Sequence, residues 1–167
     1  MAVDERDGSV TVGIERGRTL VLAAGPSSTR FSPNAAAQEW SLAEIRAGRA
    51  LIMLPTQDQF VPQMVNLELA GGVDFHKGCY PGQEIVARAQ YRGAVKRRMV
   101  RLRGAALHAG QALYGDDAPG EAGGMVVNAA GDESLAVVPI RAQEGKAPIR
   151  ARPGAAPLEI LPLPYGQ

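Results

Sequence analysis

The chain contains one cysteine, Cys79, among its 167 residues. A single thiol cannot form an intrachain disulfide, and it cannot supply the four cysteines of a structural zinc or iron–sulfur site. Long apolar runs are also missing, and residues 1–7 are too acidic for a secretory signal. These absences favour a reducing intracellular compartment, so we expect a cytoplasmic protein without a membrane segment.

Net charge is likewise almost absent. The formal value is +1, so any preference for nucleic acid or acidic substrates must come from local patches. A content of 46% hydrophobic and 21% charged residues is ordinary for a globular protein of one domain or two small ones. No phosphate-binding loop, dinucleotide fingerprint or zinc spacing is present, and His76 and His108 have no neighbouring pattern of a catalytic triad.

The most restricted stretch is the octapeptide KGCYPGQE at residues 77–84. Its two glycines predict a tight turn, and its proline fits the first turn of a helix over residues 83–90. Cys79 would then lie just ahead of a helix N-terminus, where unpaired N–H groups, the helix dipole and Lys77 favour the thiolate. The residues leave a second interpretation open, in which Cys79 is a small buried apolar residue beside the turn.

Together with its flanks, this octapeptide resembles the signature of the YgfZ family of folate-binding proteins, relatives of the glycine-cleavage T-protein. The matching segments are FHKGCYPGQE (75–84), VAR (86–88), RG (92–93), KR (96–97), FVPQ (60–63), NLE (66–68) and LPLPY (161–165), with Trp40 and Ile45. The resemblance covers most of residues 40–165, although residues 104–160 match mainly in strand pattern. Family members are ordinarily longer, so the chain resembles their C-terminal part.

The resemblance implies an α+β fold. Residues 1–93 would form part of a T-protein-like folate-binding domain, and residues 94–167 a small antiparallel β-barrel. The implied cofactor is tetrahydrofolate, with a pocket that is incomplete in this chain. The implied catalytic residues are Cys79 and Lys77, and the implied cofactor-binding residues are Trp40, Tyr80, Gln83, Glu84, Arg88 and Arg92. For Trp40, a packing role at the entry to a helix is the alternative.

The function implied by the resemblance is that of an accessory protein. It would support iron–sulfur enzymes, including tRNA methylthiotransferases, through thiol, cluster or one-carbon chemistry at Cys79. One alternative is an aminomethyltransferase, but T-protein relatives lack this type of octapeptide, and this chain lacks the region of their catalytic aspartate. Arg46 also stands where those relatives carry an acidic residue that helps to hold the pterin. A third alternative is a non-catalytic module that binds RNA or a client protein.

Local patterns predict several further elements. Residues 10–14 and 19–23 read as a β-hairpin. The capping-box spacing of Ser41 and Glu44 predicts a helix from there through Arg46, ended by Gly48. Residues 51–54 read as a buried strand, residues 56–63 as an irregular connection and residues 66–70 as a short helix.

The remaining residues alternate short apolar runs with glycine-containing turns. The strand candidates are residues 95–102, 112–114, 123–128, 134–140, 147–152 and 157–161, a spacing typical of a closed β-barrel. Adjacent carboxylates at Asp132 and Glu133 are interpreted as turn formers.

Positive charge is concentrated in one segment. Residues 85–115 hold seven lysines and arginines and no acidic residue. Strand alternation would place Arg97, Arg101 and Arg103 on one outer face, which could bind RNA phosphates or the polycarboxylate tail of a folate. The alternative is an ordinary solvated surface.

Overall fold

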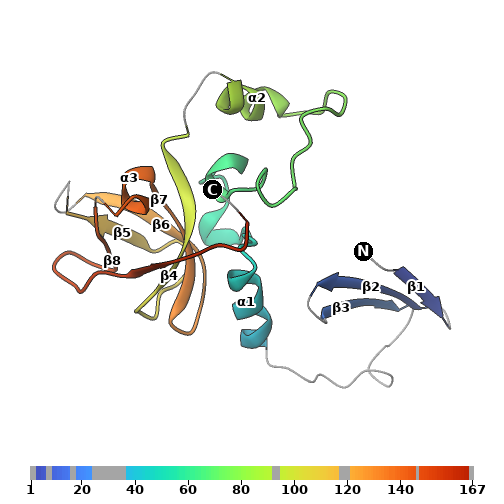
Figure 1. Cartoon of the computed structure of the whole chain (residues 1–167), viewed down its shortest axis with the longest axis horizontal. Helices are drawn as coiled ribbons and strands as arrows, with labels where there is room; N and C mark the ends of the chain where they lie inside the picture. Colours follow the sequence, from blue (N-terminus) through green and yellow to red (C-terminus); the bar gives the residue numbers. More distant parts are fainter. Residues whose placement is uncertain are drawn as a thin grey trace. The chain divides into compact units, whose positions relative to one another are not determined.

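The computed structural model describes residues 3–6, 9–15, 18–23, 37–91, 95–116, 121–145 and 147–165. Two compact units are present, Met1–Ala36 and Ala37–Gln167. The first holds an antiparallel sheet of β1 (Val3–Arg6), β2 (Ser9–Glu15) and β3 (Arg18–Ala23), drawn in blue in Figure 1. The predicted hairpin is confirmed as β2 and β3. The strand β1 was not predicted.

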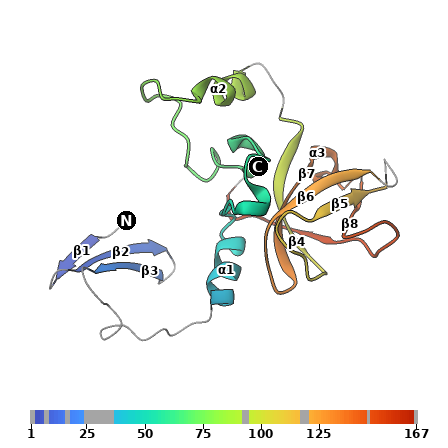
Figure 2. The same ribbon diagram turned by 180° about the vertical axis from the view of Figure 1, so that it is seen from behind.

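The second unit is built on an antiparallel sheet of six strands in the order β8-β5-β6-β7-β4-β9 (Figures 1 and 2). The strands are β4 (Arg97–Arg103), β5 (Ala112–Gly115), β6 (Ala122–Ala130), β7 (Glu133–Pro139), β8 (Ile149–Arg150) and β9 (Glu159–Leu161). Each of the six candidates from the sequence therefore contains a strand. The last residue of the fourth candidate, Ile140, instead begins the short helix α3 (Ile140–Gln143).

This sheet curls into a half-barrel. Its edge strands β8 and β9 approach each other where Arg150 forms a bridge with Pro157. Beside that bridge, the Leu158 N–H donates to the Ile149 carbonyl at 2.7 Å. The α+β class with antiparallel sheets is confirmed. The closed barrel is not: among the described residues, the sheet forms a half-barrel whose two edges meet only at this bridge. The domain boundary at residue 93 stays a prediction, because residues 92–94 lie outside the described ranges.

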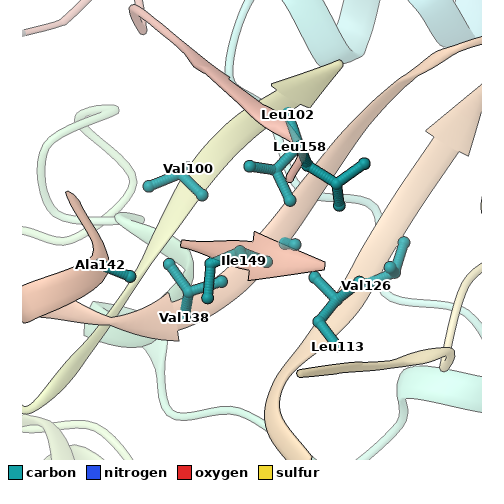
Figure 3. Packing of buried hydrophobic residues seen from close by; sticks show 9 residues of the cluster. Val100, Leu102, Leu113, Val126, Val138, Ala142, Ile149 and Leu158 are labelled. Carbon is teal, nitrogen blue, oxygen red and sulfur yellow. The ribbon is translucent and has the colours of Figure 1, made fainter. Parts of the chain in front are cut away.

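The concave side of the sheet encloses one hydrophobic core (Figure 3). Alternate residues of the central strands point into it, as strand geometry requires. Residues from α3, β8 and the approach to β9 complete it. The buried members are Val100, Leu102, Leu113, Val126, Ala136, Val138, Ala142, Ile149 and Leu158.

A second core covers the opposite side of the sheet. The intervening residues of β4, β6 and β7 pack there against α1 (Ala37–Arg46) and the 3-10 helix η3 (Pro62–Val65). The buried members are Ile45, Val65, Met99, Val127, Ala130, Leu135 and Val137. Six of the seven residues of β7 are consequently buried, and β7 is hydrogen-bonded to a strand on each side.

The predicted helix through Arg46 is confirmed but starts earlier than expected, and two other local predictions are wrong. Helix α1 begins at Ala37, before the capping-box residues, and the Ser41 hydroxyl donates to the Ala37 carbonyl at 3.1 Å within the helix. The predicted buried strand at residues 51–54 is exposed and leads into the 3-10 helix η2 (Leu54–Thr56). Residues 66–71 form turns after η3 instead of a helix.

Hydrogen bonds from a side chain explain why the exposed segment at residues 51–54 does not pair with a neighbouring strand. The Leu51 N–H donates to Asn128 Oδ1 at 2.8 Å, and Asn128 Nδ2 donates to the Leu51 carbonyl at 2.6 Å. The side chain of Asn128 thus takes the place of a neighbouring strand for Leu51. Pro55 then removes a backbone donor, so strand pairing cannot continue.

Two adjacent glycines of β6 allow a test of the close packing between β6 and β7. A methyl group on Gly124 would lie 2.7 Å from the Val137 carbonyl oxygen, whereas one on Gly123 would be no closer than 3.5 Å to its nearest neighbour. We predict that Gly124→Ala lowers the free energy of unfolding by about 1–3 kcal/mol, the usual cost of overpacking. Gly123→Ala should change it by less than about 1 kcal/mol. Urea unfolding of both variants measures the difference, and equal effects would contradict this packing.

Candidate functional site

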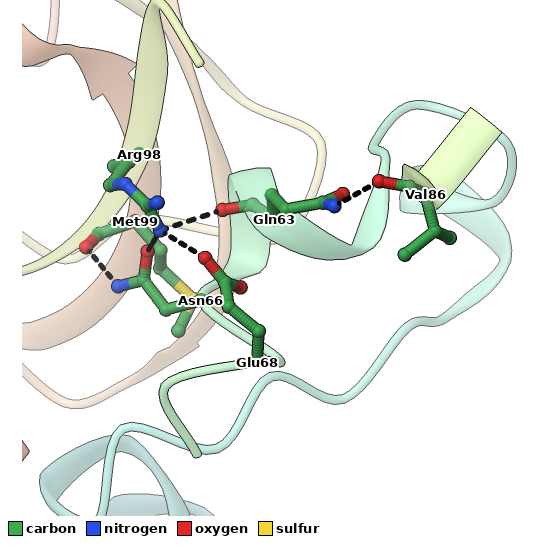
Figure 4. Close-up of polar contacts among 6 residues, drawn as sticks. All are labelled: Gln63, Asn66, Glu68, Val86, Arg98 and Met99. Carbon is green, nitrogen blue, oxygen red and sulfur yellow. Dashed lines mark hydrogen bonds and ion pairs between the residues drawn. The ribbon is translucent and has the colours of Figure 1, made fainter. Parts of the chain in front are cut away.

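A buried polar cluster holds the turn after η3 against β4 (Figure 4). Asn66 is fully buried in a left-handed conformation with φ 55°, and its Nδ2 donates to the Met99 carbonyl at 2.8 Å. Arg98 Nη1 lies 2.7 Å from Glu68 Oε1 and also donates to the Gln63 carbonyl and to Asn66 Oδ1. The start of the loop that leads to the octapeptide is therefore anchored on the sheet.

The end of that loop is tied to the same cluster through α2 (Gln83–Tyr91). Gln63 is fully buried, and its Nε2 donates to the Val86 carbonyl at 2.7 Å. The rings of Phe75 and Tyr91 meet edge to face with centroids 6.5 Å apart. Both ends of the octapeptide loop are thus positioned by contacts with η3 and α2.

Cys79 is exposed within this loop, so the interpretation of a buried apolar cysteine is wrong. The turn ahead of α2 is closed by a reciprocal pair, in which the Gln83 N–H donates to the Tyr80 carbonyl and the Tyr80 N–H donates to Gln83 Oε1, each at 3.2 Å. Gly82 has φ 84°, a conformation that favours glycine, as expected for this turn. The predicted helix from Gln83 is confirmed, with Cys79 four residues ahead of its first residue.

Lys77 lies beside the same turn. Its Nζ sits 4.9 Å from the centroid of the Tyr80 ring, a cation–π contact. His76 is almost fully exposed, and its backbone N–H donates to Asp74 Oδ1 at 2.8 Å. The loop therefore displays a thiol close in sequence to a positive charge that is held over an aromatic ring.

The residues predicted to bind the cofactor are distributed over separate places. Glu84 and Arg88 form an exposed ion pair of 2.9 Å on α2, next to an open groove of about 300 Å³ that Tyr91 also lines. Trp40 lines a different cavity of about 80 Å³, together with residues of α1 and β6. Arg92 lies outside the described residues. Small-molecule sites usually measure about 300–1,000 Å³ and enclose most of the ligand, so neither place fits a whole folate.

Two absences apply to the described part of the chain. It holds no group of three or more His, Cys, Asp or Glu residues that could bind a metal ion. None of its helices has the length and apolar character needed to cross a membrane.

The basic segment is largely neutralised by carboxylates. Arg98 pairs with Glu68 at 2.7 Å, Arg101 with Glu133 at 3.5 Å and Arg103 with Glu159 at 3.7 Å. Met99, on the same side of β4 as Arg97 and Arg101, is fully buried because α1 and η3 cover that side. The predicted outer face of Arg97, Arg101 and Arg103 is thus only partly basic.

Glu133 joins α1 to the sheet and is not the turn former that the sequence suggested. It begins β7, is 5% exposed, and accepts hydrogen bonds from Arg46 Nη2 at 2.8 Å and Nε at 3.1 Å. The Arg46 hydrogen bonds, opposed by burial and aided by the charges of Arg46 and Arg101, lower the pKa of Glu133. Arg46 thereby serves as a structural link, and sequence reasoning missed it because 87 positions separate the two residues.

An exposed cysteine in a KGCYPGQE loop beside a curled antiparallel sheet is the feature on which the resemblance to YgfZ proteins rests, and comparison with known proteins finds the same similarity. The chain is 53% identical to the tRNA-modifying protein YgfZ of Edwardsiella ictaluri over 68 residues, which cover 41% of this chain and 20% of that protein. The protein of the same name from Cronobacter sakazakii is 39% identical over 109 residues, covering 59% and 33%.

A third relative, the tRNA-modifying protein YgfZ of Photorhabdus laumondii, is 54% identical over 70 residues, covering 41% of this chain and 21% of that protein. The chain therefore spans about a third or less of the length of the curated relatives that it matches. No family model matches the chain.

The pairing of Glu133 predicts a defined pH dependence of stability. Its pKa is lowered from 4.5 in the folded protein, so its ion pairs stabilise the fold fully above about pH 4.5, and this contribution is lost as the pH falls through the lower folded value. Replacing Glu133 by Gln should cost about 1.5–3 kcal/mol at neutral pH, and the difference should shrink towards pH 3. Glu159→Gln, at an exposed pair, should cost less than about 1 kcal/mol. Urea unfolding at several pH values measures both, and a pH-independent difference for Glu133→Gln would contradict the assignment.

Proposed function

We propose that this chain acts in tRNA modification, as an accessory protein whose reactive group is the thiol of Cys79. The observation that carries the proposal is the exposure of Cys79 in the octapeptide that resembles the YgfZ signature. The relatives that the chain matches are named tRNA-modifying proteins. A thiol that reacts with a substrate or a partner must be accessible, and this one is.

The surroundings of Cys79 support a role in presenting the thiol. The loop is held at Gln63 and Asn66 on one side and by the Tyr80–Gln83 turn on the other. Lys77 is two residues from the cysteine and is held over the Tyr80 ring, so a cation accompanies the thiol in this loop. The chain would therefore offer one accessible sulfur in a loop whose ends are anchored on the rest of the unit.

We also propose that the enzymes supported by this protein are iron–sulfur proteins, among them tRNA methylthiotransferases. A cluster is ordinarily held by four cysteine thiolates, and this chain has one. Cys79 can thus be a transient ligand or a nucleophile, while the remaining ligands belong to the client enzyme. Such a division of labour fits an accessory protein better than a resident cluster.

Tetrahydrofolate, the cofactor that the resemblance implies, needs more enclosure than the described residues provide. The cavity beside Trp40 and the groove beside Arg88 are separate and lie on different helices. We therefore propose that folate binding requires further protein surface, and the Cys79 chemistry is argued without it.

This division leads to a binding prediction. Calorimetric titration of tetrahydrofolate into this chain should give no binding tighter than about 1 mM, because neither cavity encloses the ligand. The full-length Edwardsiella ictaluri relative, titrated in parallel, is the comparison. A micromolar dissociation constant for this chain would contradict the prediction.

The role of Cys79 is tested by replacement. In cells that lack their own YgfZ protein and express this chain, we expect Cys79→Ala to abolish the gain in methylthiolated tRNA nucleosides measured by mass spectrometry. Because the side chain is exposed, the free energy of unfolding should change by less than about 0.5 kcal/mol. His76→Ala, in the same loop and also exposed, is the matched control and should retain the gain. Full activity of Cys79→Ala would refute the proposed function.

A further inference from the structure

A second surface feature lies away from the octapeptide, where the curled sheet meets α3. It is an open groove of about 380 Å³ lined by Lys96, Arg97, Pro139, Ile140 and Arg141. Three of these five residues are cationic, and none of the described residues that line the groove is acidic. The groove therefore combines concentrated positive charge with a small apolar floor.

Backbone pairing fixes the two segments that supply these cations. Arg97 at the start of β4 is opposite Pro139 at the end of β7, and the Ile140 N–H donates to the Lys96 carbonyl at 3.1 Å. Ala142 is 1% exposed in the inner core, so α3 is seated on the sheet. The backbone positions of Lys96, Arg97 and Arg141 thus belong to the rigid part of the unit.

Two of the three cations of this groove, Lys96 and Arg97, come from the basic segment. Arg98, Arg101 and Arg103 each have a carboxylate within 4.0 Å, as described above. Within the described part of the chain, Lys96 and Arg97 have no such partner, and both are exposed. Lys96 and Arg97, at this end of β4, are accordingly available to an anionic ligand.

We infer that this groove binds the phosphodiester backbone of RNA. Lysine and arginine are the residues that neutralise phosphates, and the fork of an arginine can contact two phosphate oxygens. No aromatic residue lines the groove, so bases have no stacking surface there and the contact positions RNA without reading its sequence. The inference rests on the proposed function for the choice of RNA, and it assigns Arg141, which sequence analysis did not single out, to the same site.

Fluorescence anisotropy with a labelled, unmodified tRNA transcript and the whole chain tests this assignment. The variant Lys96→Gln/Arg97→Gln should bind about tenfold or more weakly at low salt. The slope of log affinity against log salt concentration should become shallower by about 1.5, since two phosphate contacts are lost. Arg141→Gln alone should weaken binding in the same direction.

The matched control is Arg103→Gln/Arg152→Gln, which removes the same charge from exposed positions outside the groove. It should change affinity less than about twofold and leave the salt slope unchanged. Thermal unfolding shows whether each variant is folded, and Lys96→Ala/Arg97→Ala is a second test if the glutamine variant is unstable. Equal losses in groove and control variants, or no loss in either, would overturn the inference. Adenosine monophosphate that binds as tightly as tRNA would also overturn it, since the ligand would then be a small nucleotide.

The outcome is separable from that of the proposed function. Normal tRNA binding by the groove variants, with loss of tRNA modification on Cys79→Ala, rejects the groove and keeps the proposed function. Weakened binding by the groove variants, with full activity of Cys79→Ala, rejects the role of Cys79 and keeps the groove.

Discussion

The side chains of Gln63 and Asn66, which are fully buried, and of Arg98, which is half-buried, hold the turn after η3 and helix α2 in place beside the sheet. Each is polar, and a buried polar group without a partner costs about 1–3 kcal/mol. Asn66 donates to the Met99 carbonyl, Arg98 donates to Glu68 Oε1 and Gln63 donates to the Val86 carbonyl. Any displacement of the turn that carries Asn66 would break several of these bonds together, so the cluster fixes where the octapeptide loop leaves the body of the protein.

This cluster also explains why charge and chemistry occupy different parts of the chain. Three of the four arginines of β4 form ion pairs with carboxylates of the loop, β7 and β9: Arg98 with Glu68, Arg101 with Glu133 and Arg103 with Glu159. Cys79 lies on a loop outside this set of ion pairs. Lys96 and Arg97 of the groove lie at the start of β4, beyond the paired arginines. The ion-paired sheet thus carries two exposed features of different chemistry, the thiol of Cys79 and the cations of the groove.

Much of the sheet was predictable from the sequence. Period-two alternation and glycine turns located all six strands of the second unit, and the proline and glycines of the octapeptide located the start of α2. Alternation distinguishes the two sides of a strand, but it does not reveal whether a second layer covers them. Met99 and Arg101 lie on one side of β4, and only the packing of α1 and η3 shows that this side is buried. The run at residues 51–54 was predicted to be a buried strand, but no strand pairs with it. The side chain of Asn128 bonds to the backbone of Leu51 instead.

The candidate site also combines features that local sequence predicts with features that only the fold reveals. Cys79 and its turn could be recognised from local residues, whereas the Arg46–Glu133 link and the position of Arg141 depend on contacts between distant segments. No local signal indicates which of seven cations will find a carboxylate. The convergence of Lys96, Arg97 and Arg141 follows from the pairing of β4 with β7 and became visible only with the fold.

Burial of β7 on both faces has a consequence for how the molecule opens. Its backbone amides are bonded between β4 and β6 and covered by two cores, so they can exchange with solvent only when the whole unit unfolds. Residues 76–82 have far fewer ties, and their amides can exchange through local opening that leaves the sheet intact. A client that reshapes the cysteine loop on docking would therefore spend little of its binding free energy on the rest of the protein.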